Sequence, residues 1–273
     1  MLMKLLRITV AALTAVTVIA FLVVFIDEKV TSDKTVPVIK IEEGVLEVNV
    51  NAKEADLLKG VTAFDKKDGD LTGRVIVESI GKFTETGSCK VTYAVSDSDN
   101  HVTTAQRRIR YTNYTPPKFT MKQPLLFSVY KQFNIMGIVG ATDCLDGDIS
   151  QNVIISSQDF EQGKEGVYTL KATVMNSKGD TSEIELPILV EKTGRDTAEI
   201  ELKQYLVYVE KGKTPDWKSY VKATYDSLGL KTDIETKTQT DFKAGKPGVY
   251  SVDYYATDEY GYVGHTRLIA VVE

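Results

Sequence analysis

Aspartates gather in two short segments of the sequence, and a further pair follows the first segment. They are Asp65, Asp68 and Asp70; Asp143, Asp146 and Asp148; and Asp97 with Asp99. Clustered carboxylates repel one another unless they turn outward or bind a cation, and hard oxygen ligands suit Ca²⁺. One interpretation is therefore a calcium site at each segment. Asp97 and Asp99 would complete the first, and Asn176 and Asp180 would add to the second.

Turn formation is the stronger interpretation of the same aspartates. Asp-Gly pairs favour tight turns, and an aspartate side chain accepts hydrogen bonds from its own backbone. The spacing also differs from that of an EF-hand loop. A pair of carboxylic acids for glycosidic hydrolysis is a third interpretation, but the sequence offers no evident substrate cleft for it. A related third segment carries Tyr225, Leu228 and Leu230 instead, so it shares none of these chemistries.

Motifs of the common enzyme classes are missing from the sequence. We find no GxSxG, HExxH, CxxC, P-loop or dinucleotide-binding motif. The two histidines, His101 and His265, are too few for a His-rich zinc site, and neither has a visible triad partner. We therefore assign no catalytic residue and no cofactor beyond the calcium considered above. We expect a protein that is not an enzyme and has no small-molecule substrate.

Charge and cysteine content narrow the choice of partners further. The chain has 33 basic and 38 acidic side chains and a net charge of −5. Nucleic-acid binding needs a net basic surface, so nucleic acid is excluded as the main partner. The two cysteines cannot form a disulfide scaffold. Cys89 occupies an apolar strand position and is expected in the core, and a bond to Cys144 would need Cα atoms within about 7 Å.

The first part of the sequence is a membrane segment. The run from Ile8 to Ile26 contains no charge, proline or glycine. As a helix it would span about 28 Å, close to the roughly 30 Å of a bilayer core. Lys4 and Arg7 precede it, which predicts a cytoplasmic stub (1–7), a linker (27–35) and a C-terminal body outside the plasma membrane. The alternative is a signal peptide cleaved near Ala20.

The rest of the sequence repeats itself three times. Each copy starts with a similar apolar segment and later contains a glycine that opens a strand; these markers are Val61 and Gly87, Val139 and Gly166, and Val221 and Gly248. After each glycine, apolar and polar residues alternate, as in Tyr250, Val252 and Tyr254. About seven short strands per copy predict an all-β fold of three tandem Ig-like β-sandwiches behind one transmembrane helix.

The repeated motifs resemble a known family. The pattern A-x-D-x-x-D-G-D-[IL]-[ST], followed by G-x-Y-x-V-x-Y-x-x-x-D-x-x-G, resembles the bacterial Ig-like domains of crystal-toxin and Gram-positive surface proteins. It covers all three copies, and the third departs most from it. The resemblance implies an extracellular β-sandwich that serves as a spacer or binding module, and it implies no particular ligand. We expect the repeats at 36–113, 114–193 and 194–273.

Together these features predict a membrane-anchored cell-surface protein that acts as a spacer, adhesion or interaction subunit. Its partner would be a protein or a cell-surface polymer. The alternative is a carbohydrate- or cell-wall-binding module, which tyrosines of the third repeat such as Tyr260 and Tyr262 keep open. Trp217 could stack on a sugar, but its equivalents Leu57 and Ile135 are apolar and favour a place in the core.

The direction of the chain predicts which end of the third repeat is free. In an Ig-like sandwich the chain enters at the end that bears the aspartate segments and leaves at the other. We therefore expect Leu228 and Leu230 to be buried at the junction with the second repeat, because exposed leucines are unfavourable. The free end would then carry basic residues, the predicted binding surface for an acidic partner: Lys211, Lys213, Lys243 and Lys246.

Overall fold

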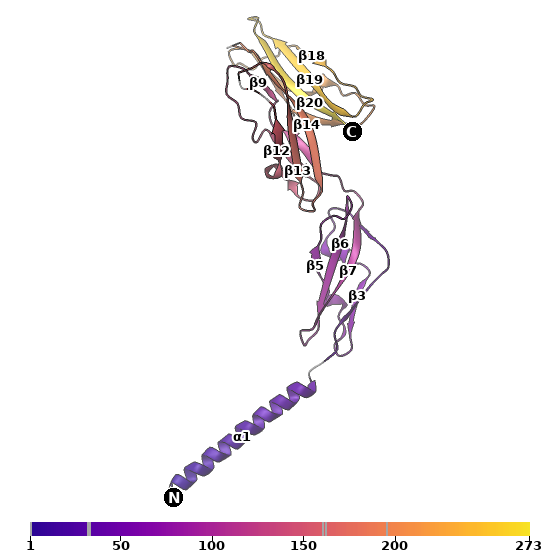
Figure 1. The fold of residues 1–273 in the computed structure, drawn as a ribbon, viewed down its shortest axis with the longest axis vertical. Helices are drawn as coiled ribbons and strands as arrows, with labels where there is room; N and C mark the ends of the chain where they lie inside the picture. Colours follow the sequence, from indigo (N-terminus) through magenta and orange to yellow (C-terminus); the bar gives the residue numbers. More distant parts are fainter. Residues whose placement is uncertain (1, 32–33, 160, 162, 195) are drawn as a thin grey trace. The chain divides into compact units, whose positions relative to one another are not determined.

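The structure, a computed structural model, describes residues 2–31, 34–159, 161, 163–194 and 196–273. Its first element is a long helix, α1 (Leu2–Thr31), and the chain after it is built mainly of β-strands (Figure 1). The helix includes the predicted span from Ile8 to Ile26, and its segment Arg7–Ile26 is long and apolar enough to cross a membrane. A signal sequence near an N-terminus can meet the same criterion, so the finding is an apolar N-terminal helix.

The chain forms two compact units. One extends to Arg110 but leaves out Asn49–Asn51 and Lys82–Gly87, which belong with Tyr111–Glu273 in the other unit. The first unit therefore contains α1 and most of the first repeat, and the second unit contains the second and third repeats.

The first repeat is a sandwich of two sheets with strand orders β1-β3-β4 and β2-β7-β6-β5. The strands are β1 (Val38–Ile41), β2 (Leu46–Val48), β3 (Val61–Asp65), β4 (Gly69–Asp70), β5 (Ile76–Ile80), β6 (Ser88–Ser96) and β7 (Val102–Tyr111). A short helix, α2 (Glu54–Leu57), and a 3-10 turn, η1 (Thr72–Arg74), lie between strands.

The second repeat has the same plan, with strand orders β11-β10-β8 and β12-β13-β14-β9. Its elements are β8 (Lys118–Met121), β9 (Leu126–Ser128), β10 (Val139–Asp143), β11 (Gly147–Asp148), η2 (Ser150–Asn152), β12 (Ile154–Gln158), β13 (Gly166–Met175) and β14 (Thr181–Glu191).

The third repeat keeps this plan with strand orders β15-β17 and β16-β20-β19-β18. Its elements are β15 (Glu199–Leu202), β16 (Leu206–Val209), η3 (Trp217–Tyr220), β17 (Val221–Tyr225), β18 (Thr236–Thr240), β19 (Gly248–Thr257) and β20 (Val263–Val272). In the second and third repeats a short early strand pairs in parallel with the last strand, β9 with β14 and β16 with β20. The predicted Ig-like sandwiches are confirmed.

Alternation along the strands places every second side chain in a core, as the sequence predicts. In β6, Cys89, Val91 and Tyr93 are completely buried, and in β19 the same is true of Val252 and Tyr254. Cys89 is therefore a core residue, and neither Cys89 nor Cys144 forms a disulfide.

In the first and third repeats, a buried tyrosine forms a hydrogen bond to the backbone of the segment that connects the two sheets. The Tyr93 hydroxyl donates to the Leu57 carbonyl, and the Tyr254 hydroxyl donates to the Trp217 carbonyl, both at 2.8 Å. Trp217 itself is half-buried against the core of its repeat and makes an edge contact with Phe242. It therefore takes the core position that its apolar equivalents favoured.

The second and third repeats share a hydrophobic core. Leu206 of β16 and Ile269 of β20 belong to the core cluster of the second repeat, and both are buried. Next to them, the backbone N–H of Phe119 donates to the Tyr208 hydroxyl at 2.8 Å. Burial of large apolar side chains from both repeats explains why they form one compact unit.

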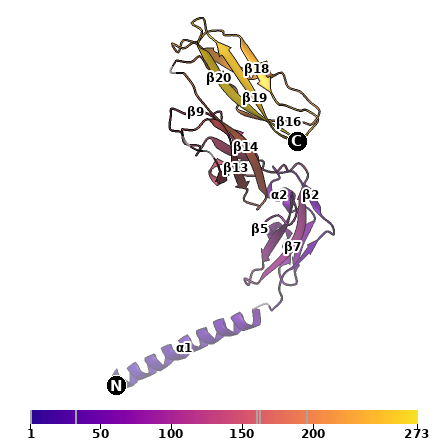
Figure 2. The same cartoon turned by 45° about the horizontal axis from the view of Figure 1, so that its top comes forward.

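The two repeats of this unit lie alongside each other with antiparallel last strands, β14 and β20 (Figure 2). His265 near the start of β20 contacts Glu191, the last residue of β14. At the opposite end, the Glu273 carboxylate follows β20 and lies 2.8 Å from the Lys118 ammonium at the start of β8. The chain therefore reverses direction between the repeats.

This reversal corrects one prediction. Leu228 and Leu230 were expected to be buried at the junction with the second repeat, but they are 68% and 62% exposed. The junction is built instead from side chains of β16 and β20, such as Leu206 and Ile269. The loop after β17 lies outside the junction, because the third repeat contacts the second through side chains of its strands β16 and β20 and not through the loops at its end.

Candidate functional site

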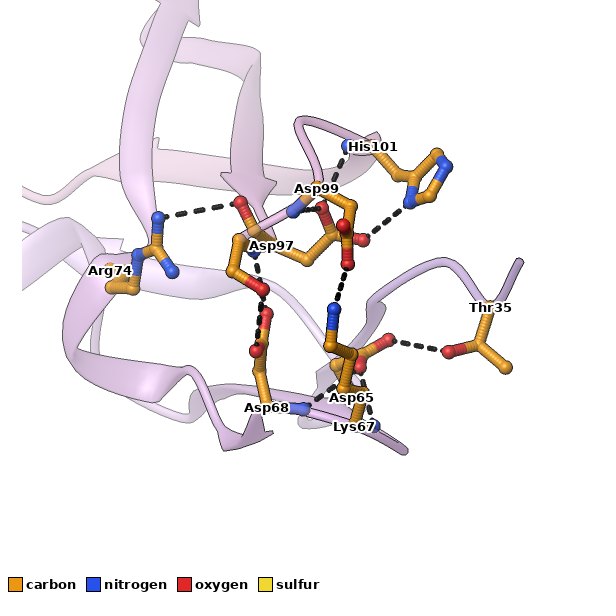
Figure 3. Close-up of polar contacts among 9 residues, drawn as sticks. Thr35, Asp65, Lys67, Asp68, Arg74, Asp97, Asp99 and His101 are labelled. Carbon is orange, nitrogen blue, oxygen red and sulfur yellow. Dashed lines mark hydrogen bonds and ion pairs between the residues drawn. The ribbon is translucent and has the colours of Figure 1, made fainter. Parts of the chain in front are cut away.

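The aspartate segment of the first repeat forms one half of a pair of adjoining turns (Figure 3). Asp65, at the end of β3, accepts hydrogen bonds from the backbone amides two and three residues later at 2.7 and 3.1 Å. Asp97, just after β6, accepts from the amides two and four residues later at 2.9 and 2.8 Å. Both carboxylates are buried, so they organise the turns as capping acceptors.

Two further contacts join these turns to each other. The Asp68 carboxylate accepts from both the backbone N–H and the hydroxyl of Ser98, at 2.6 and 2.8 Å. The Lys67 ammonium lies 2.5 Å from the Asp99 carboxylate. The two turns therefore act as one rigid loop pair at this end of the sandwich.

The imidazole of His101 completes the loop pair. Its Nδ1 lies 2.7 Å from the Asp97 carboxylate. Desolvation raises the pKa of Asp97, but hydrogen bonds from the backbone and side chain of His101 and from the Asp99 amide outweigh it, so this pKa lies below its ordinary value. The aspartate is thus held in its ionised form as an acceptor.

The second repeat builds the same loop pair with different residues. Asp143 accepts from the amides two and three residues later, and Asn176 accepts from the amides two and four residues later. The Asp146 carboxylate accepts from the N–H and hydroxyl of Ser177 at 2.6 and 2.7 Å, as Asp68 does with Ser98.

The predicted companion Asp180 enters this second loop pair through Tyr114. The Tyr114 hydroxyl donates to the Asp180 carboxylate at 2.7 Å and accepts from the Asn176 amide at 2.8 Å, and that amide also donates to Asp143. Desolvation and the neighbouring Asp180 raise the pKa of the Tyr114 hydroxyl far above its ordinary value. The tyrosine is therefore a permanent donor.

The third repeat has the same hydrogen-bonded loop pair, but it carries different side chains at the ends of the turns. Asp226 accepts from the amides two and four residues later at 3.0 and 2.8 Å, and Asp258 does the same at 3.0 and 2.8 Å. The link between the turns is the Ser227 N–H, which donates to Asp258 at 2.9 Å. The side chains at the ends of these turns are leucines and tyrosines.

The carboxylates considered for calcium are brought together only in part. Asp70 and Asp148 are exposed and accept from Thr72 and Ser150 next to them, and these hydrogen bonds lower the pKa of each carboxyl. Among the residues that the structure describes, no three His, Cys, Asp or Glu side chains gather as a metal site requires. The donors seen around Asp65, Asp68 and Asp97 are those of turn formation, and the calcium site stays a prediction.

The predicted basic surface lies at the other end of the third repeat. Its two loops adjoin, because the Gly212 N–H donates to the Ala244 carbonyl at 2.7 Å. The four side chains are exposed, and one of them pairs with Glu210: Lys211, Lys213, Lys243 and Lys246. The Lys211 N–H donates to the Glu273 carbonyl, so these loops lie close to where Glu273 meets Lys118 of the second repeat, and binding there stays a prediction.

Sequence reasoning missed a charge cluster in the second unit. His265 places Nδ1 at 2.9 and 3.0 Å from the Glu191 carboxylate and Nε2 at 3.0 Å from Asp253. Arg267 pairs with the same Asp253, and the imidazole stacks on Tyr255. Glu191 is 74 residues from His265, so no local spacing signals the contact.

This imidazole is held in its charged form. Both ring nitrogens face carboxylates, and only the imidazolium can donate from both. Burial lowers the pKa of His265, but the hydrogen bonds to Asp253 and Glu191 outweigh it and raise this pKa above its ordinary value. The cluster therefore joins the second repeat to the third through a charged hydrogen bond.

A cleft of about 780 Å³ opens in the second unit. Residues of β13 and β14, among them Tyr168 and Glu185, line one part of it, and residues of β18, β19 and β20, among them Gln239 and Arg267, line the rest. Among the charged groups at the cleft, Glu185 pairs with Lys171 and Arg267 pairs with Asp253. The Asp241 carboxylate also lines it and accepts from the Ser251 N–H at 2.8 Å. Such a lining offers hydrogen bonds to an uncharged polar molecule.

The chain is similar to two proteins over parts of their length. It is 29% identical to the pesticidal crystal protein Cry22Aa of Bacillus thuringiensis over 206 residues, 73% of this chain and 28% of that protein. It is also 29% identical to an uncharacterized 81.3 kDa protein of Acholeplasma phage L2, over 48% of this chain and 18% of that protein. The chain thus spans less than a third of either relative.

Parts of the chain are also similar to two solved structures. One is the structure of CBM51-2 in complex with GlcNAc and INT domains from Clostridium perfringens ZmpB, and the other is Drosophila N-cadherin EC1-3. The first is 24% identical with a TM-score of 0.26 and covers 55% of this chain and 26% of that one. The second is 13% identical with a TM-score of 0.31 and covers 89% and 90%. At these TM-scores the chains do not superpose as wholes.

One family matches directly. Residues 44–110 match the family described as bacterial surface protein, Ig-like domain. This segment holds β2 to β6 and nearly all of β7, together with the loop pair of Asp65 and Asp97. Most of the first repeat thus matches the family of bacterial surface protein Ig-like domains, as the resemblance of its motifs implied.

Proposed function

We propose that the protein is a non-enzymatic surface protein, anchored in the plasma membrane by one helix, whose Ig-like repeats act as a spacer and interaction subunit outside the cell. The observation that carries the proposal is the order of two parts. An apolar helix with Lys4 and Arg7 before its span stands ahead of a bacterial surface Ig-like domain. Basic residues favour the cytoplasmic side, so the repeats would lie outside.

The loop pairs support a role in display. In each repeat the turns are cross-linked by hydrogen bonds to a carboxylate, for example Asp68 with Ser98 and Asp258 with Ser227. Such turns hold the residues at their ends in place before a partner binds. Binding through these residues therefore loses little conformational entropy. Rigid presentation of loop residues is what an interaction subunit requires.

Protease treatment of intact cells tests the anchor. The expected result is digestion of the repeats while a fragment with the first 26 residues stays protected, and permeabilised cells should lose that fragment. A soluble body that is released with an N-terminus near Phe21 would overturn the anchor in favour of a cleaved signal peptide.

The cleft in the second unit favours a second candidate function, a carbohydrate- or cell-wall-binding module. Its polar groups, such as Gln239 and the Asp241 carboxylate, could form hydrogen bonds with the hydroxyls of a sugar, and Tyr168 offers part of an aromatic ring. A glycan array probed with the whole protein and with Gln239→Ala tests it. Equal signals from the two proteins, or none, would remove this candidate.

A further inference from the structure

Five apolar side chains form one exposed surface at an end of the third repeat. They are Leu228, Leu230, Tyr260, Tyr262 and Val263, here called the apolar tip, and their exposed fractions run from 42% for Tyr262 to 68% for Leu228. Two loops supply them, and the Ser227 N–H joins these loops through Asp258 at 2.9 Å. The tip is therefore one continuous surface.

The fold itself does not require an apolar tip. The other two repeats build the same turns from a buried carboxylate or amide, but they display Asp68 and Asp99 or Asp146 and Lys178 at their ends. Within each turn, the buried acceptor bonds to backbone amides of the displayed residues. The side chains of Asp68 and Asp146 add a link between the turns, which Asp258 and the Ser227 N–H provide in the third repeat. Polar residues would therefore serve the fold equally well, and apolar ones in water need another reason.

No residue that the structure describes in the second unit covers the tip. The third repeat meets the second through Leu206 and Ile269, which lie in its strands. His265 is the residue close to the tip that bonds to the second repeat, and it does so through Glu191. The apolar tip lies beyond these contacts and remains exposed in the unit that contains it.

The charges around the tip select its partner. The two loops carry five carboxylates and one lysine: Asp226, Asp233, Glu235, Asp258, Glu259 and Lys231. The pKa of the Tyr260 hydroxyl is raised, first by its hydrogen bond with Glu259 and then by the charges of Glu259, Asp226 and Asp258. A second copy of the same tip or an anionic surface would be repelled, and a basic partner would be attracted.

We propose that the apolar tip is a docking surface for a protein segment that presents apolar side chains flanked by lysines or arginines. Tyrosines are frequent anchors of protein interfaces because they combine a large rigid ring with a polar hydroxyl. The leucines would supply the dry centre of the contact and the carboxylates its charged rim. The inference rests on the proposed interaction role and names the surface and the partner chemistry for it.

The test uses the full chain in detergent micelles and three synthetic peptides with the same leucine, isoleucine and tyrosine residues. The apolar residues alternate with lysine in one peptide, with glutamate in the second and with serine in the third. Fluorescence anisotropy measures binding to the wild type and to Leu228→Asp/Leu230→Asp. The variant recreates the residue type that the first repeat carries, so the turns should stay intact, and the melting temperature checks this.

A matched control adds the same charge to apolar residues elsewhere in the unit, as Tyr130→Asp/Met136→Asp. Both residues are 71% exposed and lie in the second repeat. We expect the lysine peptide to bind the wild type more tightly than the other two peptides do. Its affinity should fall at least tenfold for the tip variant and stay unchanged, or rise slightly, for the control. If the contact were only electrostatic, the lysine peptide would bind the tip variant more tightly than the wild type, because the variant gains negative charge.

Several results would overturn the proposal. They are equal affinities of the two variants, preference for the glutamate peptide, and no binding of any peptide to the wild type. Binding of neutral phosphatidylcholine vesicles through the same two leucines would identify a lipid surface and also overturn it. The anchor is judged separately by the protease experiment, so failure here leaves that result unaffected.

Discussion

His265 illustrates how much one side chain contributes when both of its nitrogens are used. It donates to Glu191 of the second repeat and Asp253 of the third, next to Arg267 and the ring of Tyr255. Neutral imidazole could donate to only one of the two carboxylates. This polar contact between the repeats therefore depends on the protonation of His265.

We expect the stability of the second unit to fall as the pH rises. The folded-state pKa of His265 lies above the ordinary value of 6.5. Its contribution is therefore complete below pH 6.5 and is lost as the pH rises through the raised pKa. Replacement by glutamine at pH 6 should cost about 1.5–3 kcal/mol, as for hydrogen bonds to charged groups.

Urea unfolding between pH 6 and pH 9 measures this effect, with His265→Gln expected to remove the pH dependence. The control is His101→Gln, because His101 is more exposed and belongs to the first unit. A wild type whose second unit keeps the same free energy of unfolding across this range would contradict the role given to His265.

At the scale of the element, each turn depends on one buried acceptor. Asp258 accepts from three backbone amides, two within its own turn and one from Ser227. Asp258→Ala should lower the free energy of unfolding by about 1–3 kcal/mol, because it leaves donors without an acceptor. Asp258→Asn should cost less, since Asn176 supports the equivalent turn of the second repeat. Chemical denaturation followed by Trp217 fluorescence gives the values, with exposed Glu259→Ala as the control.

The strands and turns could be predicted from the sequence because their signals are local. Alternation predicts the inward faces of β6, β13 and β19, and each Asp or Asn at a strand end marks a turn. The reversal between the second and third repeats has only a weak signal. Residues Leu268 to Val272 are a continuous apolar run, which is typical of a strand buried on both faces. Alternation alone assigns one face of such a strand to solvent.

At the scale of the whole molecule, the shared core predicts how the chain unfolds. Ile269 is completely buried and belongs to the core of the second repeat although it lies in the third. The two repeats should therefore unfold in one cooperative transition, separate from that of the first unit. Ile269→Ala should destabilise both together by about 2–5 kcal/mol, because it leaves a cavity where the repeats meet.

Differential scanning calorimetry of the wild type and Ile269→Ala tests this expectation, with Val252→Ala as the matched change inside the third repeat alone. Both variants should lower the midpoint of the same transition. A variant that shifts one of two resolved transitions of the second unit would show that the repeats unfold independently.

The reversal of the chain after β14 also decides where the C-terminus lies. The last strand ends where Glu273 meets Lys118, so the chain finishes beside the beginning of the second repeat. A label or fusion attached to the C-terminus would therefore be carried back beside the start of the second repeat.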